Sequence, residues 1–421
     1  MPPPSLPLRS LLLRDFLSHH ECAAVALVCR SWHTVASAVL HGTGSLLLTS
    51  ETCALHRVPG RAERPERLHA VLRRCHALFP HLEVEQELPA ASDEQLQRVH
   101  GAVYVAMVAS MSSKVERSMA ALETIRRGHL INGKSEKALA SVAVAGTNGR
   151  VKHKPTVKSK EEYYAQFEYV DLGEDTTLMR HTLAAAREAA GGVCLAVDRV
   201  LVGERGLRNA FCAVRPPGHH AEPHQAMGFC VFNNVAVGAL HALETHGLKR
   251  VAIVDVDVHH GNGTQAVATS DPRLLYVSLH QAAPCFPSTG HASESGPHDN
   301  LLNVPLRARC SSRTYREQFR AKVSPRLLKF QPQLILVSMG FDASARDPLA
   351  DLRLEASDYY WITRELCELA WICCDGRLVS ALEGGYHLGA LADGAEKHMQ
   401  ALIHGGCRPD GLTTNMLYHT T

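Results

Sequence analysis

The chain has 421 residues, enough for one large domain or two smaller ones, and 45% of them are hydrophobic, as expected of a globular protein with a full core. Its 44 Lys and Arg nearly balance its 42 Asp and Glu, and the net charge of +2 argues against a bulk nucleic-acid binder. No apolar run approaches the roughly 18 residues that a membrane span needs. Thirteen cysteines without a CxxC pair disfavour a disulfide scaffold or a cysteine-ligated zinc ribbon, so metal or acid–base chemistry must be sought among the 26 histidines.

Residues 1–45 differ from the rest and predict a small helical N-terminal segment. Arg9 and Arg14 suggest a targeting peptide, whereas Asp15 and Glu21 argue against a cleavable one. The segment also resembles an F-box, and a helix pair that caps the main domain is the alternative. The residues that carry the F-box resemblance are Leu6, Leu11, Phe16 and Leu17, followed by Val28-Cys29-Arg30-Ser31-Trp32.

The main unit is expected to span residues 46–405, with a C-terminal tail over 406–421. A helix is predicted to open at Arg64-Pro65-Glu66-Arg67-Leu68. Residues 112–168 read as a polar insertion that ends in a basic run near 150–160. This run is expected to be a solvated loop, and a patch for nucleic acid or an acidic partner is the alternative.

Beyond residue 180, short apolar β-branched runs alternate with segments of helical length. Runs this apolar predict strands buried on both faces, so the fold class is α/β, an open and mainly parallel sheet covered by helices on both faces. The predicted strands are Phe211–Val214, Val251–Val256, Leu274–Leu279, Leu334–Ser338 and Leu378–Leu382. The predicted helices are Phe232–His246, Arg313–Phe330, Ala356–Cys373 and Leu388–His404.

Polar side chains follow four of these strands directly. In an open α/β sheet the ligand crevice lies beyond the carboxyl ends of the strands, so these residues should meet at one edge. They are His219-His220, Asp255-Val256-Asp257-Val258-His259-His260-Gly261, Asp342 and Tyr386.

Three of these residues have the pattern of a metal site. Asp257 and His259 are two positions apart, so at a strand end they project to the same side. With Asp342 they would give two carboxylates and one imidazole, and three protein ligands with one open position are typical of catalytic zinc.

The adjacent pair His219-His220 follows the turn-forming sequence Pro216-Pro217-Gly218. Two imidazoles held at a loop apex beside a metal suit proton transfer, with one ring accepting a proton and the other donating it. A pair of ordinary loop histidines is the alternative.

Six motifs resemble those of the zinc-dependent histone deacetylase family, and they are co-linear from about residue 46 to 404. The resemblance, closest to the class II branch and to related bacterial amidohydrolases, implies an arginase-like α/β fold and release of acetate from N-ε-acetyl-lysine. The motifs are RPPGHHA (215–221), MGFCVFNNVAV (227–237), DVDVHHGNGTQ (255–265), SLH (278–280), MGFDA (339–343) and LEGGY (382–386).

The resemblance also assigns roles to single residues. It places one zinc ion on Asp257, His259 and Asp342. It makes His219 the general base, which Asp255 would orient and keep basic through a hydrogen bond.

His220 would be the electrostatic or general-acid partner. Its own partner is Asn262, which stands where class I members carry a second Asp, so an imidazolium at His220 would be less stabilised. Tyr386 would donate its hydroxyl to the developing oxyanion, and because some branches with His at this position are very weak deacetylases, its presence predicts an active enzyme.

A substrate channel is implied by Gly228, Phe229 and Phe286, whose aromatic rings would hold the lysine stem. Leu349 matches a rim position where polyamine deacetylases can carry Glu, and an apolar residue there favours acyl-lysine over a cationic amine. Asp175 would bind the substrate backbone, although the residues around it depart from the usual pattern.

The resemblance further implies structural K⁺ bound through backbone carbonyls. The matching residues are Asp255, Asp257, His259, Ser278 and Leu279.

The expected function is therefore zinc-dependent removal of acetyl groups from lysines of histones or other proteins. An acetylpolyamine or small-molecule amide hydrolase and an F-box-like adaptor are the alternatives. Expected partners are acetylated proteins, with a co-repressor or a ubiquitin-ligase adaptor further candidates, and neither direct nucleic-acid binding nor a membrane is expected. The expected compartment is the nucleus or cytoplasm, or an organelle if the N-terminus is a transit peptide.

Overall fold

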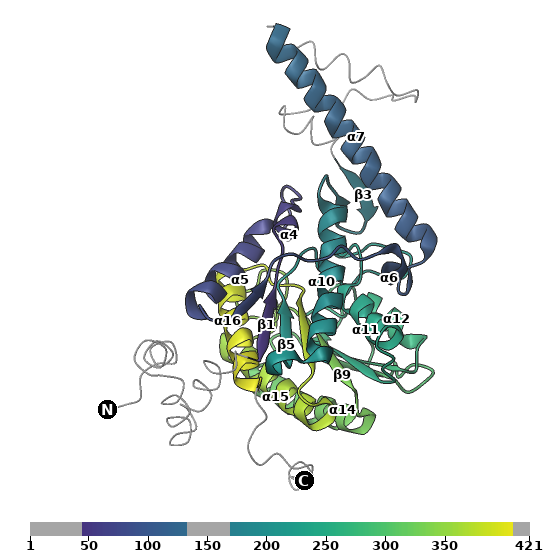
Figure 1. The fold of residues 1–421 in the computed structure, drawn as a ribbon. Helices are drawn as coiled ribbons and strands as arrows, with labels where there is room; N and C mark the ends of the chain where they lie inside the picture. The colour runs from purple at the N-terminus through teal and green to yellow at the C-terminus, as the bar shows by residue number, and fades with distance from the viewer. Residues whose placement is uncertain (1–43, 133–168, 407–421) are drawn as a thin grey trace, which may run out of the picture.

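The structure, a computed structural model, describes residues 44–132 and 169–406, with the backbone alone for 121–132 (Figure 1). The predicted N-terminal segment with its F-box resemblance, the basic run near 150–160 and nearly all of the predicted tail lie outside the described residues. Within the described part, no helix is both long and apolar enough to cross a membrane.

An eight-stranded, fully parallel sheet forms the centre of the domain, in the order β2-β1-β5-β10-β9-β6-β7-β8. All five predicted strands are present within a few residues of their expected bounds, and β1, β2 and β8 extend the sheet beyond them. In sheet order the strands are β2 (Glu83–Glu85), β1 (Ser45–Leu48), β5 (Asn209–Cys212), β10 (Leu378–Leu382), β9 (Leu334–Met339), β6 (Val251–Asp255), β7 (Leu274–Gln281) and β8 (Leu301–Leu306).

Helices cover both faces of this sheet, which confirms the predicted α/β class. One face is covered by α4 (Glu51–Leu55), α10 (Thr182–Val202), α11 (Asn234–Glu244) and α12 (Asn262–Thr269). The other is covered by α5 (Pro65–Leu78), α14 (Ser324–Phe330), α15 (Ala356–Cys374) and α16 (Leu388–Gly405). The remaining elements are α6 (Asp93–Gln97), α7 (Ala102–Asn132), the antiparallel pair β3 (Val170–Gly173) and β4 (Thr176–Leu178), the short helical turn η2 (Glu204–Gly206), α13 (Ser312–Gln318) and the π-turn η3 (Phe319–Val323).

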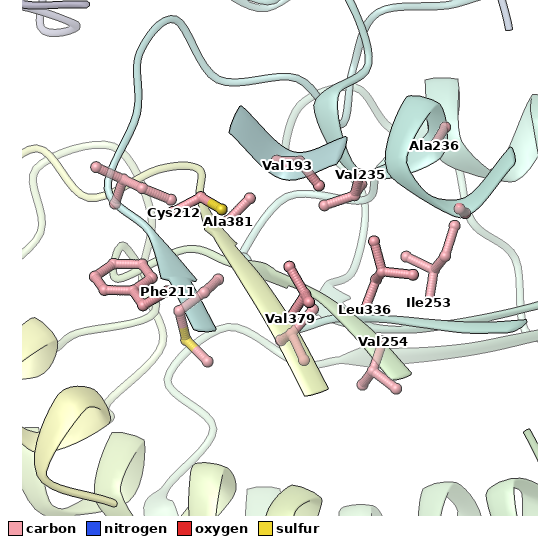
Figure 2. Packing of buried hydrophobic residues seen from close by; sticks show 14 of the residues in the cluster. Val193, Phe211, Cys212, Val235, Ala236, Ile253, Val254, Leu336, Val379 and Ala381 are labelled. Carbon is pink, nitrogen blue, oxygen red and sulfur yellow. The ribbon is translucent and has the colours of Figure 1, made fainter. Parts of the chain in front are cut away.

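The core lies between the sheet and its two helical layers. In Figure 2, Ile253 points from β6 toward Val235 and Ala236 of α11, whereas the adjacent Val254 points to the opposite face. Both side chains are fully buried, as the alternation of a strand packed on both faces requires. This explains why the central strands are apolar at most positions on both faces.

Two predicted boundaries differ from the structure. Residues 112–132, expected to begin a polar insertion, continue α7, whose second half extends away from the sheet (Figure 1). The single helix expected over 313–330 is divided into α13 and α14 by the π-turn η3. Polarity alone did not distinguish an exposed helix from a loop.

The strand order places the functional segments together. Strands β5, β10, β9 and β6 are consecutive neighbours in the sheet, and each is followed by one of the polar segments identified in the sequence. Because all four strands are parallel, their carboxyl ends lie at one edge.

Candidate active site

Three potential ligand atoms converge beyond β6 and β9. His259 Nδ1 lies 3.0 Å from Asp257 Oδ1 and 3.2 Å from Asp342 Oδ2, and the three residues meet the spacing expected for a metal site. All three side chains are buried. Two ligand atoms of a tetrahedral zinc ion, each about 2.0–2.1 Å from the metal, lie about 3.3 Å apart, so the observed spacing suits such an ion.

The surroundings of these carboxylates also fit a cation. Asp342 Oδ2 is buried and makes no hydrogen bond of good geometry within the described residues, and its ion-pair partner is His259 Nδ1 at 3.2 Å, an arrangement that suits an oxygen facing a cation. The other oxygens are held by backbone N–H groups: Val258 N donates to Asp342 Oδ1 at 3.0 Å, and Gly384 N donates to Asp257 Oδ2 at 2.8 Å. Each carboxylate therefore directs its remaining oxygen toward His259.

Glycine is required where the chain passes these carboxylates. A Cβ atom on Gly384 would lie 1.9 Å from Asp342 Oδ2, and one on Gly340 would lie 2.1 Å from Asp257 Oδ2. The glycines of the MGFDA and LEGGY motifs thus let two backbone segments approach the carboxylates closely.

The carboxylates and the imidazole perturb one another strongly. Burial and the neighbouring Asp257 raise the pKa of Asp342 above its usual range. Burial alone would raise the pKa of Asp257 as well, but His219 and His259 outweigh it and lower that pKa. Burial would lower the pKa of His259, yet both aspartates raise it well above the usual value. Strong pKa shifts that buried charged side chains cause in one another are typical of functional sites, including sites whose ligands share one cation.

The tandem histidines lie beside this cluster. The rings of His219 and His220 are 4.0 Å apart, and His219 Nδ1 is 3.0 Å from Asp255 Oδ2. Burial would lower the pKa of His219, but the carboxylates of Asp255, Asp257 and Glu383 raise it to about 10. This hydrogen bond fixes one ring nitrogen, so that Nε2 is directed toward Asp257, 3.9 Å from its Oδ1.

The second ring has a different environment. His220 Nδ1 lies 2.8 Å from Asn262 Oδ1, a neutral amide oxygen. Burial and the nearby imidazoles of His219 and His259 hold the pKa of His220 well below its usual range. The two adjacent histidines therefore favour opposite charge states.

Tyr386 completes the arrangement from the turn after β10. Its ring lies 5.9 Å from that of Phe229 and 4.9 Å from the Arg67 guanidinium. Arg67 is fully buried and donates to Gly385 O at 2.6 Å and to Glu383 O, so it holds the turn that carries Tyr386.

Aromatic side chains line the approach to these residues. The Phe286 ring lies 5.0 Å from His220 and 6.3 Å from His259. Gly228 passes close to both His220 and Phe286, because a Cβ atom there would lie 2.5 Å from the first and 3.1 Å from the second. The predicted channel residues Gly228, Phe229 and Phe286 are therefore brought together.

These features coincide with a known family. The histone deacetylase domain model matches residues 59–402. The chain belongs to the histone deacetylase family.

Relatives in several organisms support this membership. Type-2 histone deacetylase 2 of Dictyostelium discoideum is 33% identical over 380 residues, 85% of this chain and 21% of its own. Histone deacetylase 14, chloroplastic, of Arabidopsis thaliana is 42% identical over 221 residues, 51% of this chain and 52% of its own. The chain thus spans about a fifth to a half of these relatives. The crystal structure titled HDA15 HD domain superposes with a TM-score of 0.68 at 29% identity, covering 85% of this chain and 90% of that one.

Two further residues expected to contact substrate, Leu349 and Asp175, lie on segments that adjoin the site. Leu349 is 45% exposed, and its N–H donates to Asp347 Oδ1 at 3.0 Å. Asp175 lies on the β3–β4 turn, where it forms an ion pair with Arg61. That turn still contacts the channel, since Gly228 N donates to Glu174 O at 3.0 Å.

The residues expected to hold K⁺ are also neighbours. Asp255 on β6 pairs in register with Ser278 on β7, and Leu279 follows on the same strand. Asp257 N donates to Asp255 Oδ1 at 3.2 Å. The ion itself stays a prediction.

The sequence analysis missed several residues that support the site. Glu383 accepts hydrogen bonds from Gly218 N at 2.7 Å and Ser338 Oγ at 3.1 Å, and burial raises its pKa to about 7. Tyr276 donates to Asp255 Oδ2 at 3.0 Å. A buried acid directly after an apolar strand was the available signal for Glu383, whereas nothing local marked Tyr276.

Proposed function

We propose that the chain is a zinc-dependent hydrolase that removes acetyl groups from N-ε-acetyl-lysine in histones or other proteins. The observation that carries this proposal is the convergence of one imidazole and two aspartates beside a buried histidine pair and a tyrosine. His259 Nδ1, Asp257 Oδ1 and Asp342 Oδ2 would hold the ion. Zinc bound there supplies a Lewis acid that polarises a carbonyl and lowers the pKa of water.

His219 is proposed to be the base. Asp255 accepts from Nδ1–H at 3.0 Å, so Nε2 is the atom that takes up a proton on the metal side. The negative charge of Asp257 is one cause of its pKa of about 10, and neutralisation of that charge by a cation would bring the pKa closer to the range that suits a general base.

His220 is proposed to stay neutral until late in the reaction. The amide oxygen of Asn262 fixes Nδ1–H but offers no negative charge to stabilise an imidazolium. Its Nε2 lone pair would accept a hydrogen bond from a polar group of the substrate without a permanent positive charge beside the metal.

Tyr386 is proposed to donate to the developing oxyanion. Burial, opposed by Arg67, raises the pKa of its phenol well above the usual value, so the hydroxyl keeps its proton. A fixed donor in a buried site stabilises the transition state more than the ground state when it faces the oxygen that becomes charged.

Phe229 and Phe286 are proposed to hold the four-carbon stem of the acyl-lysine. The exposed Leu349 offers no anchor for a cationic amine, which favours an acyl-lysine over an acetylpolyamine.

The test compares hydrolysis of an acetyl-lysine peptide with that of N-acetylputrescine by the full chain. The chain is first stripped of metal by a chelator and then given one equivalent of Zn²⁺. We expect activity on the peptide that returns with zinc and is at least about tenfold greater, as kcat/KM, than on the polyamine, a difference of about 1.4 kcal/mol in the activation free energy.

An Asp257→Asn variant is the control, because it should lose both the zinc and the activity. Preference for N-acetylputrescine would overturn the proposed substrate. Full activity of zinc-free protein on the peptide would overturn the proposed metal dependence.

A further inference from the structure

A second cluster of metal-ligand side chains lies at the seam between α10 and α11. Asp198 Oδ1 is 2.7 Å from His241 Nε2 and 2.6 Å from His246 Nε2. The two imidazole rings are 5.5 Å apart and nearly perpendicular. Both Nε2 atoms therefore point at the same carboxylate oxygen, and the three residues meet the spacing expected of a metal site.

The backbone around these residues is well fixed. Asp198 belongs to α10, which packs against α11, and His241 lies in the last turn of α11. The helix end beyond it is closed by Gly247, with φ of 67°, and by a hydrogen bond from Leu248 N to Ala242 O at 3.3 Å. This termination holds His246 back over the seam beside His241.

The neighbouring groups orient one of the rings. Thr245 Oγ1 lies 3.2 Å from His241 Nδ1, and Arg98 donates to that hydroxyl at 3.0 Å. In the structure His241 Nε2 contacts a carboxylate oxygen and therefore carries a proton. When a cation replaces that proton, Nδ1–H donating to Thr245 leaves the Nε2 lone pair for the metal, the tautomer that outer hydrogen bonds select in metal sites. The positive charge of Arg98 is balanced by Glu94 at 3.0 Å.

We propose that Asp198, His241 and His246 bind a divalent transition-metal ion of the zinc type, separate from the candidate active site. Two imidazoles and one carboxylate match the donors that zinc prefers, whereas Mg²⁺ and Ca²⁺ select oxygen ligands. Three protein ligands leave an open position for water. Because the ligands come from α10, from α11 and from the turn after α11, the bound ion links α10 to the end of α11.

Binding requires only a small expansion of the cluster. The hydrogen-bonded atoms must separate from 2.6–2.7 Å to about 3.3 Å to surround a tetrahedral ion. The side chain of Asp198 is 42% exposed and that of His246 is 26% exposed, so both can move, while the buried His241 stays in place.

The test measures zinc bound by the full chain at equilibrium with micromolar free Zn²⁺, together with the thermal unfolding temperature. We expect two zinc ions per chain in the wild type and one in His246→Ala and in Asp198→Asn. Both variants should keep the wild-type activity, because neither residue touches the candidate active site. Zinc should raise the unfolding temperature of the zinc-loaded wild type further, whereas Mg²⁺ should not.

His76→Ala, which removes an exposed histidine of α5, is the matched control and should still bind two ions. Variants that bind as many ions as the wild type would overturn the site, whatever the total number of ions. An equal response to Mg²⁺ would overturn the assigned class of metal. Since the ion count separates the two sites, failure of the proposed hydrolase function would leave this result intact.

Discussion

Tyr386 is the residue whose proposed role leads to the most specific kinetic prediction. Its hydroxyl contributes nothing to holding the proposed ion, and its ring is positioned by packing against Phe229 and Arg67. Because burial raises its pKa well above the usual value, the phenol keeps its proton and can act as a hydrogen-bond donor near neutral pH. Its contribution should therefore appear in the rate and not in metal binding.

We expect Tyr386→Phe to lower kcat by about 100- to 1,000-fold, the usual loss for one oxyanion donor, with little change in KM or zinc content. Tyr104→Phe is the matched control, since it removes another buried hydroxyl, one that donates to Val231 O at 2.7 Å. That variant should lose about 1 kcal/mol of stability and keep its kcat. Equal losses of kcat in the two variants would contradict the assigned role.

Substitution of Asp342 should have opposite effects on zinc binding and on the stability of the zinc-free protein. Its Oδ2 makes no hydrogen bond of good geometry within the described residues, and burial and the neighbouring Asp257 raise its pKa, so the metal-free protein holds this charge at a cost that His259 offsets only in part. We expect Asp342→Asn to weaken zinc binding by more than about 100-fold, beyond the loss typical of an outer-shell partner. The zinc-free variant should unfold at the same or a higher urea concentration than zinc-free wild type.

Asp358→Asn provides the comparison. This buried carboxylate is well satisfied, with Arg316 Nη2 at 2.7 Å and Glu355 N at 2.8 Å. That variant should be less stable and bind zinc normally. A marked loss of stability in zinc-free Asp342→Asn would contradict this expectation and show that the contacts of the carboxylate with Val258 and His259 outweigh the cost of its burial.

At the scale of elements, the turn between β10 and α16 joins the metal cluster to Tyr386. Gly384 passes over both carboxylates, and Arg67 of α5 holds the next carbonyls. The position of the proposed oxyanion donor is thus coupled to the metal site through three residues of backbone.

Gly384→Ala tests this close approach. The added methyl group would lie 1.9 Å from Asp342 Oδ2, so either the turn or the carboxylate must move. We expect loss of zinc binding and of activity while the far-ultraviolet circular dichroism stays that of the wild type. Gly389→Ala, whose methyl group would lie 3.3 Å from the His387 ring and 3.7 Å from Arg346 Nη1, should keep both. Retained zinc binding in Gly384→Ala would show that the turn is more adaptable than its contacts indicate.

The same elements show what sequence can predict. Strands such as β6 and β9 were predictable because nearly every position is apolar, and the polar residues at and beyond their carboxyl ends located the site. β2 was not, because Glu83 and Glu85 at this short sheet edge carry no apolar pattern. The extension of α7 was missed because an exposed helix and a polar loop have similar composition.

For the site itself, residues within motifs were predictable and residues that support them from a distance were not. Asp257 and His259 are two positions apart in sequence and meet where expected. Arg67 contacts Gly385 from 318 positions away, a contact that depends on the packing of α5 against the end of the sheet. Sequence identified it only as part of a helix start.

At the scale of the whole molecule, a structural role explains some of the histidines that lie outside the candidate active site. Several histidines far from the metal cluster are buried and hydrogen-bonded as neutral rings. His398 lies between Thr363 Oγ1 at 2.7 Å and Ser380 Oγ at 2.8 Å, and burial lowers its pKa to about 3. Burial likewise lowers the pKa of His100 to about 4. These rings act as polar core residues, joining helices to strands and loops.

Such histidines make the fold sensitive to acid. A ring whose pKa falls from about 6.5 in the unfolded chain to about 3 in the fold binds more protons when unfolded, so stability is lost as the pH falls below 6.5. At pH 5, the cost is about 2 kcal/mol for a fully buried ring such as His398.

We expect the free energy of unfolding, measured in urea, to fall steeply between pH 6.5 and 5. In His398→Gln this decrease should be smaller by about 2 kcal/mol, whatever the stability at pH 7, whereas the exposed His76→Gln should follow the wild type. An unchanged pH dependence in His398→Gln would contradict this expectation. It would mean that the ring is already doubly protonated in the fold and donates to both hydroxyl oxygens.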